Sequence, residues 1–175
     1  MKLEVLEGSG FILRPWVTED VDNLHRNANN PKIARNLRDG FPHPYTLADA
    51  KSWIEMIQAN KKDLVYAIDV NGEACGGIGL HAMQDVYRFN AEIGFWLAEK
   101  HWGKGIVTEA VDLLVKHCFQ NFQWVRIFAG VFSTNKASMH VFEKNGFTRE
   151  AIHRKAVKKE GVFLDEIIYA KLKAK

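Results

Sequence analysis

Gly103 and Gly105 stand between a segment with strand periodicity and a segment with helix periodicity. Apolar residues alternate along Ile93–Leu97 before the glycines, and they recur at helical spacing after them, at Val107, Ala110, Val111, Leu114, Val115 and Cys118. The first backbone N–H groups of a helix have no partner within it, and the helix dipole adds partial positive charge there. Glycines leave those N–H groups accessible because they have no side chain. The pattern therefore predicts a phosphate or pyrophosphate site at residues 103–108.

The two glycines match neither of the best-known phosphate loops. A Walker A loop needs Gly-x-x-x-x-Gly-Lys followed by Ser or Thr, which this stretch lacks. The dinucleotide fingerprint needs Gly or Ala three residues after its second glycine, where this chain has Thr108. A glycine turn that simply ends a strand stays open as the structural alternative.

Length and composition indicate one soluble domain. The chain has 175 residues, with 47% hydrophobic and 26% charged residues, which is enough for a sizeable core. A net charge of +3 does not by itself indicate a nucleic-acid partner. Neither a membrane-spanning apolar run nor a signal-peptide core is found, so we expect a cytoplasmic protein. Cys75 and Cys118 match no metal-binding spacing, and we expect no metal.

Turn signals and periodicity divide the chain into alternating elements. Strands are expected near residues 11–16, 64–70, 74–81, 87–97, 124–132, 147–152 and 162–171. Helices are expected near 18–28 and 31–37, after Thr46, after Gly105, and over 135–145. Thr18, Thr46 and Asn135 are the expected N-caps, and Asn71-Gly72 is a hairpin turn. Hairpins followed by a β-α-β crossover predict an α/β fold, with one mixed sheet and helices on both faces.

Two motifs together resemble the GNAT N-acetyltransferase family. That family binds pyrophosphate with Gln/Arg-x-x-Gly-x-Gly/Ala, and aligning Gly105 puts Trp102 at the Gln/Arg position and Val107 at the last one. Residues 135–147 are similar to the family's helix after the fifth strand, N-x-x-S/A-x-x-x-Y/F-E-K-x-G-F. The resemblance covers nearly the whole chain. It points to the branch that includes the ribosomal-protein N-terminal alanine acetyltransferases, some members of which have other amine substrates.

The resemblance implies a single acetyltransferase domain over residues 1–175 and a place for acetyl-CoA. The mostly antiparallel sheet, of about seven strands, would splay between strands 89–97 and 124–132 and hold the cosubstrate in the gap. Residues Phe95, Trp96 and Leu97 would hold the thioester and pantetheine arm. The pyrophosphate would lie on Gly103, Lys104, Gly105, Ile106, Val107 and Thr108. Asn135 would contact the pantetheine, in addition to any role as an N-cap.

The implied chemistry is direct attack of a primary amine on a thioester. It requires a base for the amine and benefits from an acid for the departing thiolate. Many relatives use a tyrosine where this chain has Phe142, which cannot donate a proton. Ser138, one helical turn earlier, is our candidate donor near the sulfur, and a serine bonding its own backbone is the alternative. Glu92 is the candidate base, directly or through water; the alternative is an acid paired with Arg or Lys.

We therefore expect an acetyl-CoA-dependent N-acetyltransferase. Its acceptor would be a protein N-terminus or a small amine such as a polyamine, amino acid or drug. The loop 38–45 and the hairpin 154–164 are expected to flank the acceptor opening. A module that binds acyl-CoA without catalysis is the alternative, and the absence of tyrosine at Phe142 is its one argument. We expect no nucleic-acid or membrane partner, and monomer and homodimer both stay open.

Overall fold

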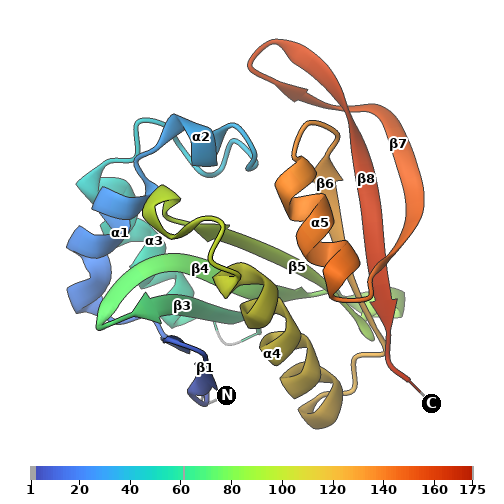
Figure 1. Ribbon diagram of the computed structural model, residues 1–175, viewed down its shortest axis with the longest axis horizontal. Helices are drawn as coiled ribbons and strands as arrows, with labels where there is room; N and C mark the ends of the chain where they lie inside the picture. The colour runs from blue at the N-terminus through green and yellow to red at the C-terminus, as the bar shows by residue number, and fades with distance from the viewer. Residues whose placement is uncertain (1–2, 61, 175) are drawn as a thin grey trace.

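One mixed sheet organises the chain, with strand order β1-β2-β3-β4-β5-β6-β8-β7 (Figure 1). The computed structural model describes residues 3–60 and 62–174. The strands are β1 (Leu6–Gly8), β2 (Phe11–Pro15), β3 (Leu64–Val70), β4 (Glu73–Ala82), β5 (Asn90–Leu97), β6 (Arg126–Phe132), β7 (Thr148–Lys159) and β8 (Val162–Leu172). The α-helices are α1 (Val21–Ala28), α2 (Pro31–Ala34), α3 (Leu47–Ala59), α4 (Ile106–Asn121) and α5 (Lys136–Lys144). Short 3-10 helices lie at Thr18–Asp20, Asp85–Tyr87 and Glu99–His101.

The predicted α/β fold is confirmed, with one strand more than the sequence indicated. β1 was missed because three residues are too few to show an alternating pattern. β7 continues to Lys159 instead of ending at Ile152, since an irregularity between His153 and Val157, with Lys155 at a φ of 50°, interrupts its alternation.

Strands β5 and β6 are the parallel pair of the sheet, and they separate soon after they meet. Their pairing is confined to Asn90↔Arg126, Ala91↔Ile127 and Glu92↔Phe128. Beyond these pairs β5 continues to Leu97 and β6 to Phe132, and the two ribbons run apart (Figure 1). The predicted splay is therefore confirmed. It leaves the backbone of both strands free to bond something other than a neighbouring strand.

Helices cover both faces of the sheet over two apolar clusters. On one face α4 buries Leu114, Val115 and Cys118 against the sheet, and Phe142 of α5 belongs to the same cluster. On the other face Leu24 of α1 and Ile54 of α3 pack in a second cluster with β3 and β4. Fully burying a Leu or Ile side chain contributes roughly 1.5–3 kcal/mol. Within the described residues, no helix is long and apolar enough to cross a membrane.

Most of the expected helix and turn signals are present. Thr46 begins α3 with a capping box: its Oγ1 accepts the Asp49 N–H at 3.2 Å, and Asp49 Oδ2 accepts the Thr46 N–H at 2.8 Å. Asn71 and Gly72 both have positive φ angles, of 55° and 82°, as a tight hairpin turn requires. The short helix expected over 31–37 ends at Ala34.

Thr18 was predicted wrongly as an N-cap. It is the first residue of a 3-10 helix, and its neighbour Val17 occupies the cap position. The carboxylate of Asp20 accepts the Val17 N–H at 3.0 Å and also binds Arg14, so Asp20 rather than Thr18 holds the start of this helical segment.

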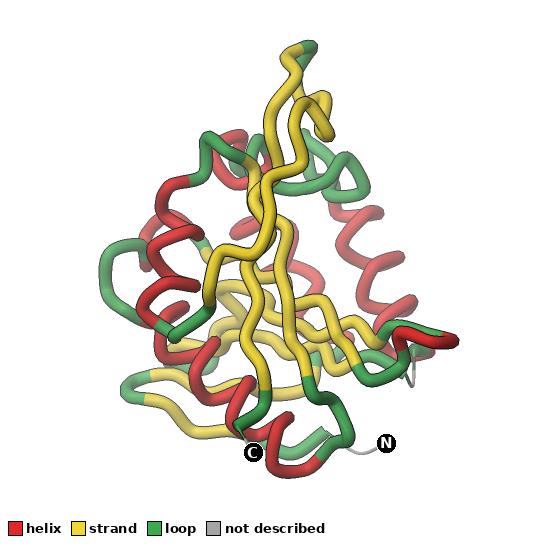
Figure 2. Tube along the Cα trace, turned by 90° about the vertical axis from the view of Figure 1, so that its right-hand side faces the viewer, coloured by secondary structure: helices red, strands yellow, loops and turns green. Residues whose placement is uncertain are grey.

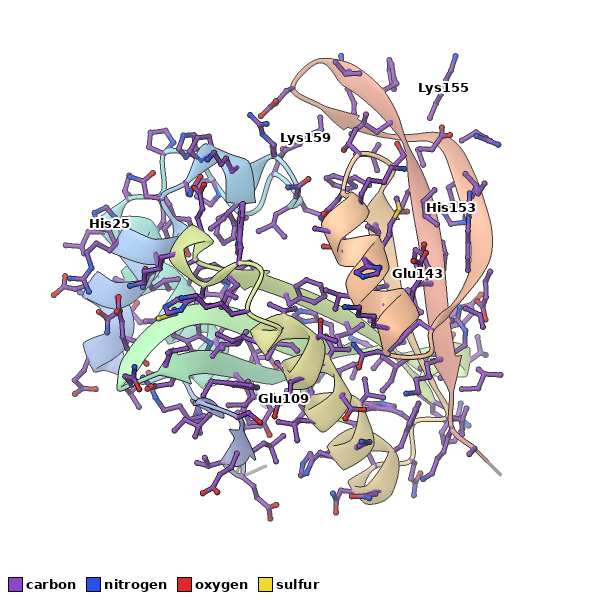
Figure 3. All side chains as sticks on the ribbon, in the orientation of Figure 1. His25, Glu109, Glu143, His153, Lys155 and Lys159 are labelled. Atoms are coloured by element: carbon purple, nitrogen blue, oxygen red, sulfur yellow. The ribbon has the colours of Figure 1, made fainter. Side chains whose placement is uncertain are left out.

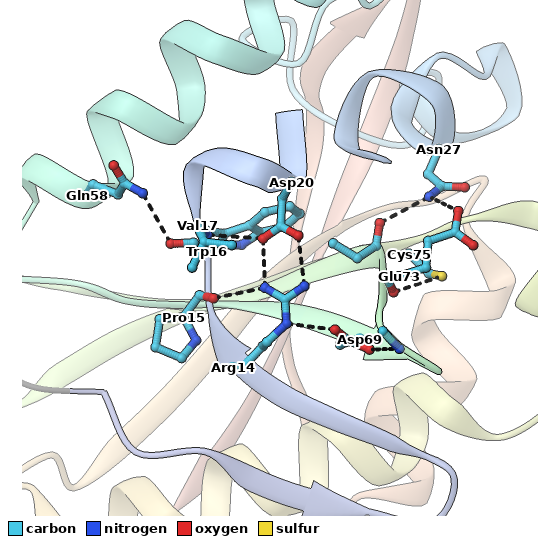
Figure 4. A network of polar contacts seen from close by, with 12 residues as sticks. Arg14, Pro15, Trp16, Val17, Asp20, Asn27, Gln58, Asp69, Glu73 and Cys75 are labelled. Carbon is cyan, nitrogen blue, oxygen red and sulfur yellow. Dashed lines mark hydrogen bonds and ion pairs between the residues drawn. The ribbon is translucent and has the colours of Figure 1, made fainter. Parts of the chain in front are cut away.

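Arg14 joins three elements through one largely buried ionic network (Figure 4). Its guanidinium donates to both oxygens of Asp20, at 2.7 and 2.8 Å, and its Nε donates to Asp69 at 2.7 Å. The other oxygen of Asp69 accepts the Gly72 N–H at 2.7 Å. Strand β2, the start of α1 and the β3–β4 turn are thus fixed to one another.

Candidate active site

A cavity of about 480 Å³ lies where β5 diverges from β6. Its walls are the end of β5, the loop into α4, one face of α5, and α2 with the residues after it. The predicted site residues that line it are Phe95, Trp96, Leu97, Gly103, Gly105, Ile106, Val107, Thr108, Asn135 and Ser138. Lys104 and Glu92 are not among the lining residues. The fold thus brings ten of the twelve predicted residues to one cavity, although their binding roles stay predictions.

The loop before α4 has the conformation that only glycine adopts easily. Gly103 and Gly105 have φ angles of 74° and 79°, and nothing lies within 4 Å of a Cβ placed on either. The Glu109 N–H donates to the Gly105 carbonyl at 3.1 Å, as the first full turn of α4. The N–H groups of residues 106–108 therefore have no partner within the helix and point toward the loop. This end of α4 can accept an anionic group such as a pyrophosphate.

Trp102 ties this loop to the end of β5. Its indole Nε1 donates to the Leu97 carbonyl at 2.7 Å, and the side chain remains partly exposed. This donor is therefore already used within the chain. At the position where the related motif has Gln or Arg, the chain thus has no free side-chain donor for a ligand.

Asn135 and Ser138 bind each other at the start of α5. Asn135 Oδ1 accepts the Ser138 N–H at 3.2 Å, which confirms the predicted N-cap. Asn135 Nδ2 donates to Ser138 Oγ at 2.9 Å. The serine oxygen is therefore already an acceptor, and among the described residues its own O–H has no bonding partner. A hydroxyl held this way can donate its proton into the cavity that both residues line.

Glu92 is the last β5 residue that pairs with β6. Its carboxylate forms an ion pair with Arg38, and Arg38 Nη1 lies 3.3 Å from the second oxygen. Of the two roles that the sequence left open, pairing with an arginine is present. The role of Glu92 as a base stays a prediction.

Comparison with known proteins identifies the family. Residues 11–148 match the family model described as Acetyltransferase (GNAT) domain. The chain belongs to the GNAT acetyltransferase family. The "Probable N-acetyltransferase YjcK" of Bacillus subtilis (strain 168) is 49% identical over 176 residues, covering 95% of this chain and 96% of that protein. The family expected from the sequence is thus confirmed, and with it an acetyl-CoA-dependent N-acetyltransferase.

Two further comparisons describe the branch and the fold. The "Putative ribosomal N-acetyltransferase YdaF" of the same bacterium is 35% identical over 146 residues, covering 83% of this chain and 74% of that protein. The solved structure titled RimL, a ribosomal L7/L12 alpha-N-protein acetyltransferase in complex with coenzyme A, superposes with a TM-score of 0.87. It is 22% identical and covers 97% of this chain and 98% of that chain, so this likeness shows the GNAT fold alone.

Phe142 is buried in the core of this GNAT domain. Its side chain is 2% exposed, and its ring packs against Phe95 at 5.4 Å, Phe147 at 5.1 Å and Tyr169 at 6.0 Å between centroids. Tyr169 does not replace the missing tyrosine, because its hydroxyl donates to Glu143 at 2.7 Å. Burial and this hydrogen bond raise the pKa of Tyr169 to about 12. Phe142 therefore has a packing role.

Sequence reasoning missed several residues that line the cavity. They are Lys32, Ile33, Asn36 and Leu37 from the α2 region, His101 from the turn before the loop, and Ala137, His140, Val141 and Lys144 from α5. Those of α5 could have been found, since Ala137, Val141 and Lys144 follow one another at spacings of four and three residues, which places them on one helical face. Those of the α2 region gave no local signal. Glu99 holds α2 in place, by an ion pair with Lys32 and a 2.8 Å hydrogen bond from Asn30.

His101 has a ring nitrogen without a partner at the cavity. Among the described residues, its Nδ1 is buried and makes no hydrogen bond. Burial and the positive charges of Lys104 and Lys100 lower the pKa of His101, against a weaker opposing effect of Glu73. The imidazole therefore favours its neutral form and has an unused ring nitrogen beside the expected phosphate site.

Proposed function

We propose that this GNAT enzyme transfers the acetyl group of acetyl-CoA to a primary amine by direct attack, with a protein N-terminal amine as the leading acceptor. The observation that carries the proposal is the Asn135–Ser138 pair, which presents a hydroxyl donor to the cavity. The 35% identity to a putative ribosomal N-acetyltransferase supports the choice of acceptor. A small amine, such as a polyamine, an amino acid or a drug, is the alternative.

The cavity supports binding of acetyl-CoA along its length. The N–H groups of residues 106–108, opened by Gly103 and Gly105, would hold the pyrophosphate. At Phe95–Leu97 the edge of β5 that faces β6 has no strand partner, because the two strands diverge after Glu92. This free edge would bind the pantetheine arm and the thioester carbonyl. Asn135 has a second N–H on Nδ2 with which to contact the pantetheine.

The transfer then needs two proton movements. The amine nitrogen attacks the thioester carbon, so that an N–C bond forms and the C–S bond breaks. The amine gives up a proton to Glu92, directly or through water, and the thiolate gains one from the Ser138 hydroxyl, which in turn recovers a proton from water. The ion pair with Arg38 keeps Glu92 in place at the point where β5 and β6 separate.

A non-catalytic acyl-CoA-binding module is the second candidate. The observation in its favour is that Phe142 has no hydroxyl and is packed in the core. The geometry of Ser138 argues against it, because a module that only binds acyl-CoA does not need a donor directed into the cavity.

The test is a thiol-release assay with acetyl-CoA and a mixed panel of amines: peptides that begin with Ala or Ser, polyamines, amino acids and aminoglycosides. Release with one class, confirmed by the mass of the acetylated product, would establish both the reaction and the acceptor. Acetyl-CoA that binds without release over the panel and over folded ribosomal proteins would favour the binding module. Failure to bind acetyl-CoA at millimolar concentration would contradict both candidates.

A further inference from the structure

At the splay, one face of the sheet is covered by α4 and α5, and the side chains of β6 alternate between this face and the opposite one. On β6, Ile127, Ala129 and Val131 are buried in the core beneath those helices. Because side chains alternate along a strand, Phe128 and Gly130 face the other side. Phe128 and Gly130 therefore lie on the face of β6 that α4 and α5 do not cover.

Glu166 of β8 lies over this part of β6. A Cβ placed on Gly130 would come within 2.4 Å of Glu166 Oε1 and 2.8 Å of its Cδ, so the carboxylate occupies the space above the glycine backbone. Gly130 lies two residues beyond Phe128, the last β6 residue paired with β5. The carboxylate is therefore placed at the start of the β6 arm of the splay.

The loop after α2 and the β7–β8 hairpin contact each other. Lys159, near the tip of the β7–β8 hairpin, binds Asp39 of the loop after α2 at 2.7 Å. Figure 2 shows the hairpin rising beyond the rest of the molecule, and Figure 3 shows Lys159 directed back toward that loop, whereas Lys155 points outward. The loop 38–45 and the hairpin 154–164 thus meet at this ion pair. Their expected position beside the acceptor opening stays a prediction.

Neighbouring carboxylates in this region are neutralised by basic side chains. Besides Asp39, Glu92 pairs with Arg38, Asp165 with Arg154 at 2.7 Å, and Glu150 with Arg126. In each of these four ion pairs a carboxylate is matched by one Lys or Arg.

Glu166 itself has no such partner. Within the described residues no Lys or Arg lies within 4.0 Å of it, and no hydrogen bond reaches its carboxylate; the basic group within that distance is the imidazole of His153, whose Nδ1 lies 3.5 Å away. The side chain is only 19% exposed, so water replaces a partner only in part. Burying a carboxylate is costly unless it is paired, so a cation that hydrogen-bonds to Glu166 would offset that cost.

We propose that Glu166 is a specificity-determining residue that binds a second positive charge on the acceptor, separate from the amine that is acetylated. The proposal rests on the proposed N-acetyltransferase function. The attacking amine must be neutral to react, and its proton is already assigned to Glu92, so Glu166 acts on a different group of the acceptor, one that stays charged. That group is an ammonium or guanidinium, from either a polyamine or a basic side chain near a peptide N-terminus.

The test compares acceptors that differ by one charge. Putrescine is paired with butylamine, and an Ala-Lys peptide with an Ala-Gln peptide, and kcat/KM is measured for each. For whichever pair is acetylated, we expect the native enzyme to favour the doubly charged member by about tenfold, as one charge-assisted hydrogen bond allows. The variant Glu166→Gln is expected to abolish the preference through KM. Glu150→Gln, which removes a paired carboxylate on the neighbouring strand, should retain it.

A second variant tests the geometry without removing the charge. Gly130→Ala forces the Glu166 carboxylate from its position and should reduce the same preference while leaving acetyl-CoA affinity unchanged. An equal preference in Glu166→Gln and in the native enzyme, or none in the native enzyme, would overturn the proposal. Calorimetric titration of putrescine and the Ala-Lys peptide into native protein and Glu166→Gln separates the two proposals. If no amine is acetylated, the proposed function fails. The role of Glu166 is then decided by calorimetry: it is supported if the native protein binds these amines and Glu166→Gln does not, and it is overturned if both proteins bind them equally or neither does.

Discussion

The amide of Asn135 and the hydroxyl of Ser138 form a closed pair at the entrance to α5, with the Nδ2–Oγ bond at 2.9 Å and the return bond from the Ser138 N–H at 3.2 Å. The first bond uses the serine oxygen as an acceptor, and the second caps the helix. One asparagine therefore both stabilises α5 and leaves the serine proton available. These two effects can be separated by substitution.

The variant Asn135→Asp separates the capping of α5 by Asn135 from its hydrogen bond to Ser138 Oγ. A carboxylate still accepts the Ser138 N–H and is favoured at a helix N-terminus, so the midpoint of urea unfolding should stay the same or rise. It cannot donate to Ser138 Oγ and instead accepts the serine proton, so we expect kcat to fall by about tenfold or more. The exposed Asn121→Asp at the end of α4 is the matched control. Full activity in Asn135→Asp would show that the Nδ2 donor has no catalytic effect.

Gly105→Ala tests the loop before α4. The residue has a φ of 79°, so alanine there is strained, and we expect unfolding to become easier by roughly 1–2 kcal/mol. Acetyl-CoA affinity should also fall, by about fivefold or more, because the N–H groups of residues 106–108 shift. Gly10→Ala in the β1–β2 turn, at a φ of 81°, is the control for strain alone. If both variants bind acetyl-CoA equally well, this loop is not the pyrophosphate site.

His101 should make acetyl-CoA binding depend on pH. Burial and the nearby Lys104 and Lys100 lower its pKa in the free protein, and bound phosphate charge would raise it again. The protonated protein then binds more tightly, so affinity should increase as pH falls from 8 to 6. A shift of one pKa unit is worth up to about tenfold.

The phosphates of acetyl-CoA titrate in the same pH range, so they too make binding depend on pH. The effect of His101 is therefore the difference in pH dependence between the native protein and a variant without this histidine. Calorimetry of acetyl-CoA binding should give a steeper pH dependence for the native protein than for His101→Gln. His117→Gln, at the far end of α4, should behave as the native protein does. Parallel curves for the native protein and His101→Gln would rule out a phosphate contact by His101.

Arg14→Met should be among the most destabilising single substitutions. It leaves the carboxylates of Asp20 and Asp69 largely buried without their cation, for which the expected loss is about 3–5 kcal/mol in the free energy of unfolding. The exposed Arg26→Met removes a 3.6 Å surface pair with Glu73 and should cost less than about 1 kcal/mol. Equal losses in urea unfolding would mean that the network of Figure 4 is not a main source of stability.

Local signals made the centre of the fold predictable. The change of period around Gly103 and Gly105 identified β5, its loop and α4, and Asn135 marked the start of α5. Each is a property of consecutive residues: an alternating pattern, a backbone that needs glycine, or a cap three residues from its partner N–H. The splay between β5 and β6 followed from the family resemblance rather than from any local pattern.

Contacts between distant segments could not be predicted. The α2 wall of the cavity depends on Lys32 binding Glu99, 67 residues later, and Glu92 meets Arg38 across 54 residues. A single sequence contains no record of which charges pair at such separations. Glu166 was missed for the same reason: its proposed role depends on Gly130 of β6 and on the absence of a Lys or Arg partner among the described residues, both of which follow only from the assembled sheet.

The most direct measurement is steady-state thiol release by native protein and Ser138→Ala, with the preferred acceptor and with acetyl-CoA affinity measured in parallel. Thr134→Ala, exposed just before α5, is the matched control. We predict that kcat falls by about a hundredfold in Ser138→Ala, the typical value of a positioned acid, while acetyl-CoA affinity changes by less than about threefold. An unchanged kcat would contradict the role of Ser138 as proton donor, and so would a loss that weaker acetyl-CoA binding fully explains.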